Sequence, residues 1–148
     1  GIFNNISKIK KIYEKHSILN LKYIKVHKEV NKTLELLKTN KIKLGIVTSK
    51  DIKRTKVILK KFKIPIKIVV SPQKKLKGKP FPDQILFALK KLMSSKKKTC
   101  YVGDMLVDYQ AAKNAKISFI FANYGYGKKN KLFKRIIYKP KDILKFAI

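Results

Sequence analysis

The feature that most constrains the fold is a repeated order of segments: an apolar, β-branched run, a polar or glycine-containing loop, then a helix with one apolar face. Four such runs lie at residues 43–47, 66–70, 99–102 and 117–122, and helical patterns follow the first three. Strands that alternate with helices pair in parallel, because the helix returns the chain to the same end of the sheet. The sequence therefore predicts an α/β fold with a mainly parallel, doubly wound sheet flanked by helices.

Apolar residues at helical spacing place the helices around these strands. Asn40 marks the end of an early helix, and Pro82 suits the first turn of a later one. The region 71–82, rich in proline and glycine, is expected to be a loop. Helices are expected at residues 26–37, 52–62, 85–93, 108–115 and 142–146, with an edge strand at 136–138 and an N-terminal amphipathic helix that carries Ile2, Ile6, Ile9 and Tyr13.

Size and composition favour one domain with its own core. The chain has 148 residues, of which 45% are apolar, and this is enough for a buried core. No apolar stretch approaches the roughly 20 residues of a membrane helix, and no secretory signal is evident, so we expect a cytoplasmic protein. The single cysteine, Cys100, cannot form an internal disulfide and lies in an apolar run, which predicts a core side chain.

The chain is strongly basic: 38 lysine and arginine residues stand against 8 acidic ones, for a formal net charge of +30. Such a field favours polyanions and makes nonspecific nucleic-acid binding steeply salt-dependent. However, nearly all the basic residues are lysines spread over every segment, a pattern that compositional drift also produces, whereas base-reading sites usually prefer arginine. The charge leaves a nucleic-acid-binding role open without requiring it.

Two carboxylates follow one of the predicted strands, at the end where parallel sheets bind ligands. Asp104 comes directly after Gly103, and Asp108 lies one helical turn later, so both side chains can face one point. Two hard oxygen donors suit Mg²⁺, which keeps several waters and takes other ligands from substrate. The alternative is that Asp104 caps a helix while Asp108 lies exposed in its first turn.

Thr48 and Lys79 are the candidate phosphate-binding residues. The Thr48 hydroxyl and the amides that follow, from Ser49 onward, can donate to phosphate oxygens at a helix N-terminus, although residues 48–51 also resemble a capping box. Lys79 lies in a proline-stiffened loop, where an ammonium group can neutralise a phosphoryl group; the alternative is a solvated loop lysine. The glycine-containing residues 123–127 either shape the same pocket or form an ordinary turn.

Taken in order, residues 46–50, 79–83 and 103–108 resemble motifs two, three and four of the haloacid dehalogenase (HAD) superfamily of hydrolases, and in particular its phosphoglycolate phosphatase-like branch. Residues 121–127 are similar to the loop that follows the fourth motif. The resemblance covers about residues 23–148 and implies a Rossmann-like α/β core. It also implies hydrolysis of a small phosphorylated metabolite through a phosphoaspartyl intermediate.

The resemblance assigns roles to individual residues. Thr48 and Lys79 are the implied catalytic residues: Thr48, with Ser49, binds and orients the phosphoryl group, and Lys79 binds it and offsets its charge. Asp104 and Asp108 are the implied Mg²⁺ ligands. In the family, an aspartate nucleophile and a second aspartate two positions later precede motif two, and neither occurs in these 148 residues.

The absent motif has structural implications. By resemblance, residues 1–22 are the remnant of a helical cap domain and residues 23–148 an incomplete core, without the central strand between those ending at Thr48 and Asp104. Those two strands then either pair directly or leave backbone groups unpaired. We expect this chain alone to be inactive, less stable than a whole family member, and inclined to self-associate.

Three interpretations of function stay open at this point. The first is a piece of a Mg²⁺-dependent phosphomonoesterase, and the second a noncatalytic HAD-like module that binds phosphorylated or polyanionic ligands. The third is a basic nucleic-acid-binding protein that shares only the fold. An in-frame Asp-x-Asp segment upstream of Gly1 in the encoding DNA distinguishes the first from the second. Binding to duplex DNA that survives moderate salt supports the third.

Overall fold

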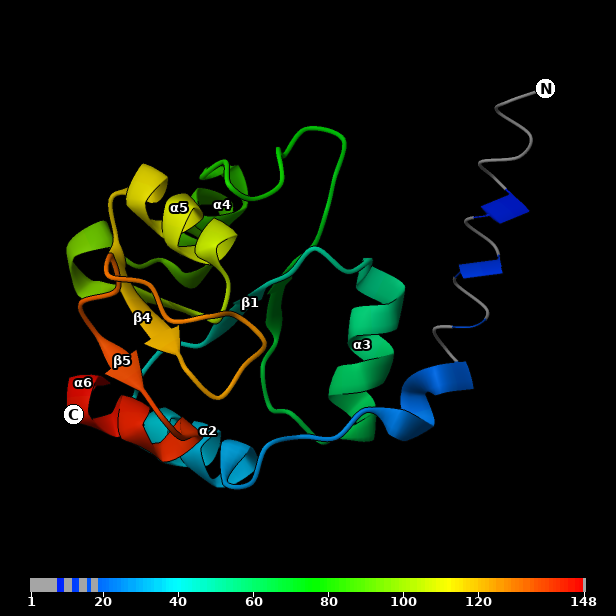
Figure 1. The fold of residues 1–148 in the computed structure, drawn as a ribbon, viewed down its shortest axis with the longest axis horizontal. Coiled ribbons are helices and arrows are strands. Elements are labelled where there is room, and N and C mark those ends of the chain that lie inside the picture. Colours follow the sequence, from blue (N-terminus) through cyan, green and yellow to red (C-terminus); the bar gives the residue numbers. More distant parts are fainter. Residues whose placement is uncertain (1–7, 10–11, 14–15, 17–18, 148) are drawn as a thin grey trace.

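The computed structural model describes residues 8–9, 12–13, 16 and 19–147. Over these residues, strands and helices alternate along the chain in the expected order (Figure 1). The expected N-terminal helix carrying Ile2 and Ile6 lies mostly outside the described residues. The predicted α/β class, with parallel strands flanked by helices, is confirmed.

The strands form two separate parallel sheets. In one, β1 (Gly45–Val47) pairs with β2 (Ile68–Val70); in the other, β4 (Ser118–Ala122) lies between β3 (Cys100–Gly103) and β5 (Ile136–Ile137). Over the described residues, β1 does not pair with β3. Of the two outcomes expected for the missing central strand, the structure therefore shows the second, in which β1 and β3 each keep one unpaired edge.

The helices lie on both sides of these strands (Figure 1). α4 (Asp83–Leu92) packs against β1 and β2, and α5 (Leu106–Ala115) packs against α4, β3 and β4. On the other side, α2 (Val30–Thr39) packs against the C-terminal segment η3 (Pro140–Ile143) and α6 (Leu144–Ala147). None of the helices in the described part of the chain is both long and apolar enough to cross a membrane.

Some helices begin at other residues than expected, and the backbone conformation or the capping residue explains each difference. α2 begins at Val30, later than expected, because Glu29 has a left-handed conformation (φ 68°) that a helix cannot include. Its end at Asn40 is confirmed, since the Asn40 N–H donates to the carbonyl of Leu36. α3 (Ile52–Lys61) is capped by Asp51, whose carboxylate accepts from the Arg54 N–H at 2.8 Å.

One cluster of the core packs against the second sheet, another lies between α4 and α5, and neither includes Cys100. Phe121 and Ile120 of β4 are fully buried, and Ile120 packs with Ile137 and Leu37. Cys100 is exposed, so the prediction of a core cysteine is wrong. The physical reason is the split sheet: β3 is an edge strand that pairs with β4 on one side only, and its other side borders an opening.

Candidate active site

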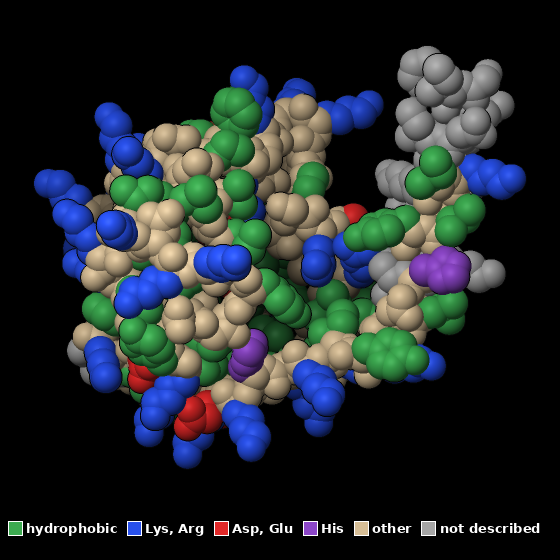
Figure 2. Space-filling view, in the orientation of Figure 1, with side chains coloured by type: hydrophobic (Ala, Val, Ile, Leu, Met, Phe, Trp, Pro, Cys, Tyr) green, Lys and Arg blue, Asp and Glu red, His purple; other side chains and the backbone are tan. Residues whose placement is uncertain are grey.

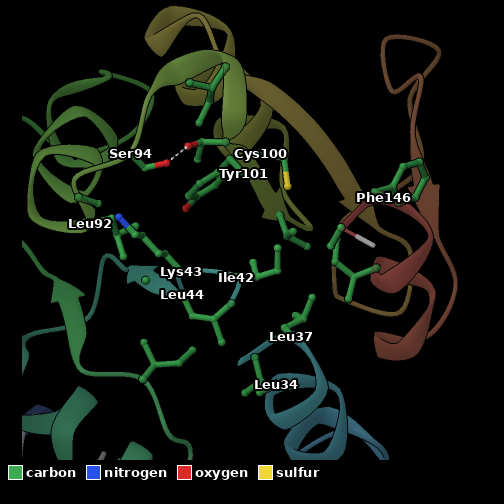
Figure 3. A pocket seen from close by; sticks show the side chains of 18 of the residues that line it. Leu34, Leu37, Ile42, Lys43, Leu44, Leu92, Ser94, Cys100, Tyr101 and Phe146 are labelled. Carbon is green, nitrogen blue, oxygen red and sulfur yellow. Dashed lines mark hydrogen bonds between the residues drawn. The ribbon is translucent and has the colours of Figure 1, made fainter. Parts of the chain in front are cut away.

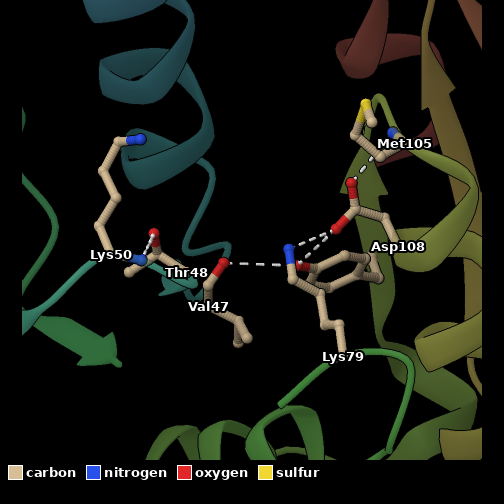
Figure 4. A network of polar contacts seen from close by, with 7 residues as sticks. Val47, Thr48, Lys50, Lys79, Met105 and Asp108 are labelled. Atoms are coloured by element: carbon tan, nitrogen blue, oxygen red, sulfur yellow. Dashed lines mark hydrogen bonds and ion pairs between the residues drawn. The ribbon is translucent and has the colours of Figure 1, made fainter. Parts of the chain in front are cut away.

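The candidate residues lie in or just after the loops at the carboxyl ends of the strands, and Figure 4 shows Thr48, Lys79 and Asp108 among them. Thr48 directly follows β1, and its N–H donates to the carbonyl of Val70 at 3.0 Å, which extends the pairing with β2. Asp104 directly follows β3, and Asp108 lies in the first turn of α5. Lys79 comes from the loop between β2 and α4. In Figure 4, Lys79 lies between Val47 and Asp108.

Lys79 and Asp108 form a buried ion pair. Lys79 Nζ lies 2.5 Å from Asp108 Oδ1, and the two side chains are 13% and 5% exposed. Asp108 Oδ2 accepts from the Met105 N–H at 3.0 Å, as expected of an acidic residue that turns back to the start of its helix. The alternatives of a solvated Lys79 and an exposed Asp108 are therefore wrong.

Tyr101 is a site residue that the sequence did not indicate. Its hydroxyl lies 3.4 Å from Asp108 Oδ1 and 3.4 Å from the carbonyl oxygen of Val47, so it bridges from β3 toward β1. Burial and, next, the Asp108 carboxylate raise the pKa of the Tyr101 phenol far above its usual range. The phenol therefore stays protonated at neutral pH and donates its hydrogen bond to these oxygens. The sequence does place Tyr101 on the strand that leads to Asp104. However, an aromatic residue in a strand normally indicates core packing, so this position did not mark it as a site residue.

The loop after β4 holds Asp104. The Tyr126 N–H donates to Asp104 Oδ2 at 2.8 Å. The loop can approach this closely because it contains glycines: a Cβ added at Gly125 would lie 2.3 Å from the Asp104 Cβ, and one at Gly127 1.6 Å from the Asp104 carbonyl oxygen. Residues 123–127 do form a turn, in which the Gly125 N–H donates to the Ala122 carbonyl at 3.0 Å, and this turn contacts the candidate site residue Asp104.

Thr48 does not cap a helix. The cap of α3 is Asp51, and the Thr48 hydroxyl instead accepts from the Lys50 N–H at 3.1 Å. Over the described residues, no hydrogen bond joins Thr48 to Lys79 or Asp108. Ser49 is exposed beside it. The hydroxyl group of Thr48 thus stands at the end of β1, near the ion pair but not part of it (Figure 4).

The carboxylates fit a Mg²⁺ site in chemistry, and Asp104 is the better placed of the two. Tyr126 engages one Asp104 oxygen and leaves the other free to bind a ligand, whereas Lys79 and Met105 engage both oxygens of Asp108. Among the described residues, no group of three or more His, Cys, Asp or Glu side chains could hold a metal ion. The remaining oxygen ligands of a Mg²⁺ ion would come from water, substrate or other residues.

The parallel α/β fold, with charged side chains at the carboxyl ends of its strands, is shared by several classes of enzyme, and comparisons with known proteins show which family this chain belongs to. The sequence pattern of the haloacid dehalogenase-like hydrolase family matches residues 2–122. The chain is 30% identical over 138 residues to a phosphoglycolate phosphatase of Aquifex aeolicus (strain VF5), an alignment that spans 90% of this chain and 65% of that protein.

Solved structures show the same fold. A hydrolase from Pseudomonas syringae has a TM-score of 0.80 and 26% identity, over 92% of this chain and 66% of that one. A haloacid dehalogenase-like hydrolase from Streptococcus pneumoniae has a TM-score of 0.81 and 20% identity, over 97% of this chain and 70% of that one. The protein belongs to the haloacid dehalogenase-like hydrolase family, and the resemblance inferred from its motifs is confirmed. It spans 65% of the length of its curated relative.

Proposed function

We propose that this chain is part of a Mg²⁺-dependent phosphomonoesterase that acts on a small phosphorylated metabolite, in the manner of phosphoglycolate phosphatases. The observation that carries the proposal is the ion pair of Lys79 and Asp108, with Asp104 just before the same helix, at the carboxyl ends of β1 and β3. A lysine held by one carboxylate, beside a second carboxylate that is partly exposed, suits a phosphoryl group and a divalent cation. The similarity to the Aquifex aeolicus phosphoglycolate phosphatase supports the substrate class.

In this proposal, the position of each site residue gives it a role in binding the phosphoryl group or Mg²⁺. Asp108 holds the Lys79 ammonium in one place, so that it meets phosphoryl oxygens without reorganisation as their charge develops. Thr48 and the exposed amides after it donate to the same oxygens. The loop at residues 123–127 fixes Asp104, which with Asp108 would hold Mg²⁺. When bound, Mg²⁺ would supply charge neutralisation and orientation of the phosphoryl group.

The nucleophilic aspartate of the proposed enzyme lies outside these residues. Two observations support this: β1 and β3 leave room between them for a further strand, and the chain spans only 65% of its curated relative. In this proposal residues 23–148 form an incomplete core and residues 1–22 belong to a helical cap. This chain alone would then be inactive, because no residue described here can accept the phosphoryl group at that position.

The encoding DNA and the whole protein test the proposal. We expect an in-frame Asp-x-Asp segment upstream of Gly1, and Mg²⁺-dependent release of phosphate by the whole protein. Asp104→Asn should abolish this activity, and Lys79→Ala should lower kcat by about 10²–10³-fold, the usual cost of removing one charge-stabilising group. Lys75→Ala, in the same loop but exposed, is the control and should keep full activity. Full turnover by Asp104→Asn would show that the metal site is misassigned.

The charge of +30 favours a secondary property, nonspecific binding of polyanions. Figure 2 shows lysine and arginine side chains spread over the whole visible face, not gathered in one patch. We therefore expect binding to duplex DNA to vanish as salt rises; binding that survives 200 mM salt would favour the nucleic-acid-binding alternative. We also propose a cytoplasmic location, and self-association only where salt screens the lysine repulsion.

A further inference from the structure

Tyr124 joins the core to the loop that holds Asp104. It belongs to the loop at residues 123–127, whose Tyr126 N–H donates to Asp104 Oδ2 at 2.8 Å. The Tyr124 ring packs against the buried cluster that contains Ile137. Burial and, next, the Asp104 carboxylate raise the pKa of the Tyr124 phenol, so this side chain stays neutral in the physiological pH range. The loop and the core are therefore connected through this aromatic side chain.

The rest of this loop has little that packs inward. Gly125 and Gly127 have no side chains, and the side chain of Tyr126 is 98% exposed. Glycines also leave the backbone a wide choice of conformations. Asn123 and Tyr124 are the residues of the loop whose side chains are half-buried, and Tyr124 is the larger of the two. The position of the Tyr126 N–H therefore depends on how firmly the Tyr124 ring is held.

The core does not enclose the Tyr124 ring completely. Tyr124 borders the cavity of about 910 Å³ between the two sheets, which is also lined by Leu37, Ile42 and Tyr101 (Figure 3). A second aromatic side chain, His27, contacts the Tyr124 ring: the two ring centroids are 4.9 Å apart, and the ring planes lie at 66° to each other. Such edge-to-face contacts are favourable beyond the area that they bury. His27 therefore adds support to a ring that the core holds only in part.

His27 is itself held by the start of α2. It lies in the segment at residues 24–29, which connects η1 (Asn20–Tyr23) to α2. The His27 carbonyl accepts from the Val30 N–H at 3.3 Å, and α2 packs against η3. The His27 side chain is exposed, so its removal should leave the fold intact. The contact between the two rings can therefore be removed without disturbing the core.

We propose that Tyr124 is a positioning residue for Asp104 and that His27 completes its support, so that the segment at residues 24–29 holds a candidate metal ligand in place. The His27 ring fixes the Tyr124 ring, the Tyr124 ring fixes the loop, and the Tyr126 N–H in turn fixes Asp104. The positioning follows from these contacts alone. Its consequence for Mg²⁺ rests on the proposed function, in which Asp104 is a metal ligand and the groups that orient a ligand tune its affinity.

Amide hydrogen exchange, followed by NMR on the isotope-labelled chain, tests the positioning. The Tyr126 amide reports the hydrogen bond to Asp104. The Asn123 amide, which donates to the Ile137 carbonyl at 2.9 Å, is the internal reference at the start of the same loop. Asp104→Ala removes the acceptor and gives the exchange rate of a Tyr126 amide without this bond.

We expect His27→Ala to speed exchange of the Tyr126 amide by about 2–12-fold, the effect of losing one aromatic pair, and to leave the Asn123 amide unchanged. His27→Phe keeps a ring at this place and should return the Tyr126 rate to within about twofold of the wild type. Tyr124→Leu removes the ring that both contacts need and should have at least the effect of His27→Ala. His16→Ala, a second exposed histidine, is the control and should change neither amide.

Three results would overturn the proposal. Unchanged Tyr126 exchange in both His27→Ala and Tyr124→Leu would show that Tyr124 only packs into the core. Equal acceleration of the Tyr126 and Asn123 amides by His27→Ala would show a general loosening of the loop and not a specific effect on Asp104. Failure of His27→Phe to restore the rate would show that the ring contact is not the cause.

A titration with Mn²⁺, which binds the same oxygen ligands as Mg²⁺, separates this inference from the proposed function. Bound Mn²⁺ broadens the NMR signals of nearby amides, so we expect broadening at Asp104 and Tyr126 in the wild-type chain. His27→Ala should need about twofold or more Mn²⁺ for the same broadening. Equal Mn²⁺ dependence of the two proteins, together with faster Tyr126 exchange, would refute the link to the metal. No broadening in the wild type would count against the metal site of the proposed function, whereas amide exchange would still decide the positioning.

Discussion

Removal of the Lys79 ammonium by Lys79→Met should destabilise the fold far more than loss of a surface charge. The pair is close, at 2.5 Å, and its side chains are 13% and 5% exposed. A surface ion pair contributes about 0–1 kcal/mol, whereas breaking a buried one costs about 3–5 kcal/mol, because the remaining charge loses its partner. Asp108 would keep its bonds from Met105 and Tyr101, so we expect the lower end, about 3 kcal/mol.

Urea unfolding at pH 7, followed by circular dichroism, measures this cost. A double-mutant cycle with Asp108→Asn, which keeps an acceptor for the Met105 N–H, isolates the pair; we expect a coupling energy of about 1.5 kcal/mol or more. Lys75→Met, an exposed lysine of the same loop, is the control and should change stability by less than about 0.5 kcal/mol. A cost below about 1 kcal/mol for Lys79→Met, with coupling near zero, would refute the buried pair.

Three further predictions concern the glycine loop, the core and the C-terminal segment. Gly127→Ala should cost about 3 kcal/mol or more, because the added Cβ meets the Asp104 backbone, whereas Gly78→Ala, with nothing within 4 Å, should be neutral or slightly stabilising; equal Tm values would contradict this. Phe121→Ala should cost about 3–5 kcal/mol, since this ring is fully buried and stacks on Phe133, whereas Tyr126→Ala, 98% exposed, should change little in the same urea assay. The backbone N–H of Tyr138 lowers the pKa of Asp142, so its charge stabilises the fold above about pH 4 and stops doing so as pH falls through the lowered pKa. Asp142→Asn should therefore lower Tm at pH 7, and this difference in Tm should shrink as pH falls below about 4; a difference that stays constant through acid pH would contradict this origin.

The sequence was sufficient for the order of elements and for the family. Apolar runs and helical spacing predicted each strand and nearly every described helix within a few residues, because those patterns depend on local periodicity. Glu29 shows the limit: its left-handed conformation delays α2, and no periodicity indicates it. Cys100 shows a second limit, since an apolar run predicts burial only if its strand lies inside a sheet, and β3 has a partner strand on one side only.

Some features of the candidate site could be predicted from the sequence, and others could not. Asp104 and Asp108 could be named from the sequence because it has only 8 acidic residues, and Lys79 could be named because of its proline-stiffened loop. Three contacts could not be predicted from the sequence. They are the ion pair between Lys79 and Asp108, the contact of Tyr101 with β1, and the hydrogen bond from the loop at residues 123–127 to Asp104. These contacts join segments distant in the chain, and their distances depend on how helices and strands pack.

The sequence by itself determined the α/β order, the family and the residues that carry charge at the strand ends, because each depends on residue type and local spacing. The tertiary structure alone decided that β1 and β3 stay apart, that Asp108 is engaged by Lys79, and that an apolar cavity lies between the sheets. Strand pairing and burial are properties of the whole packing arrangement, and local patterns do not contain them.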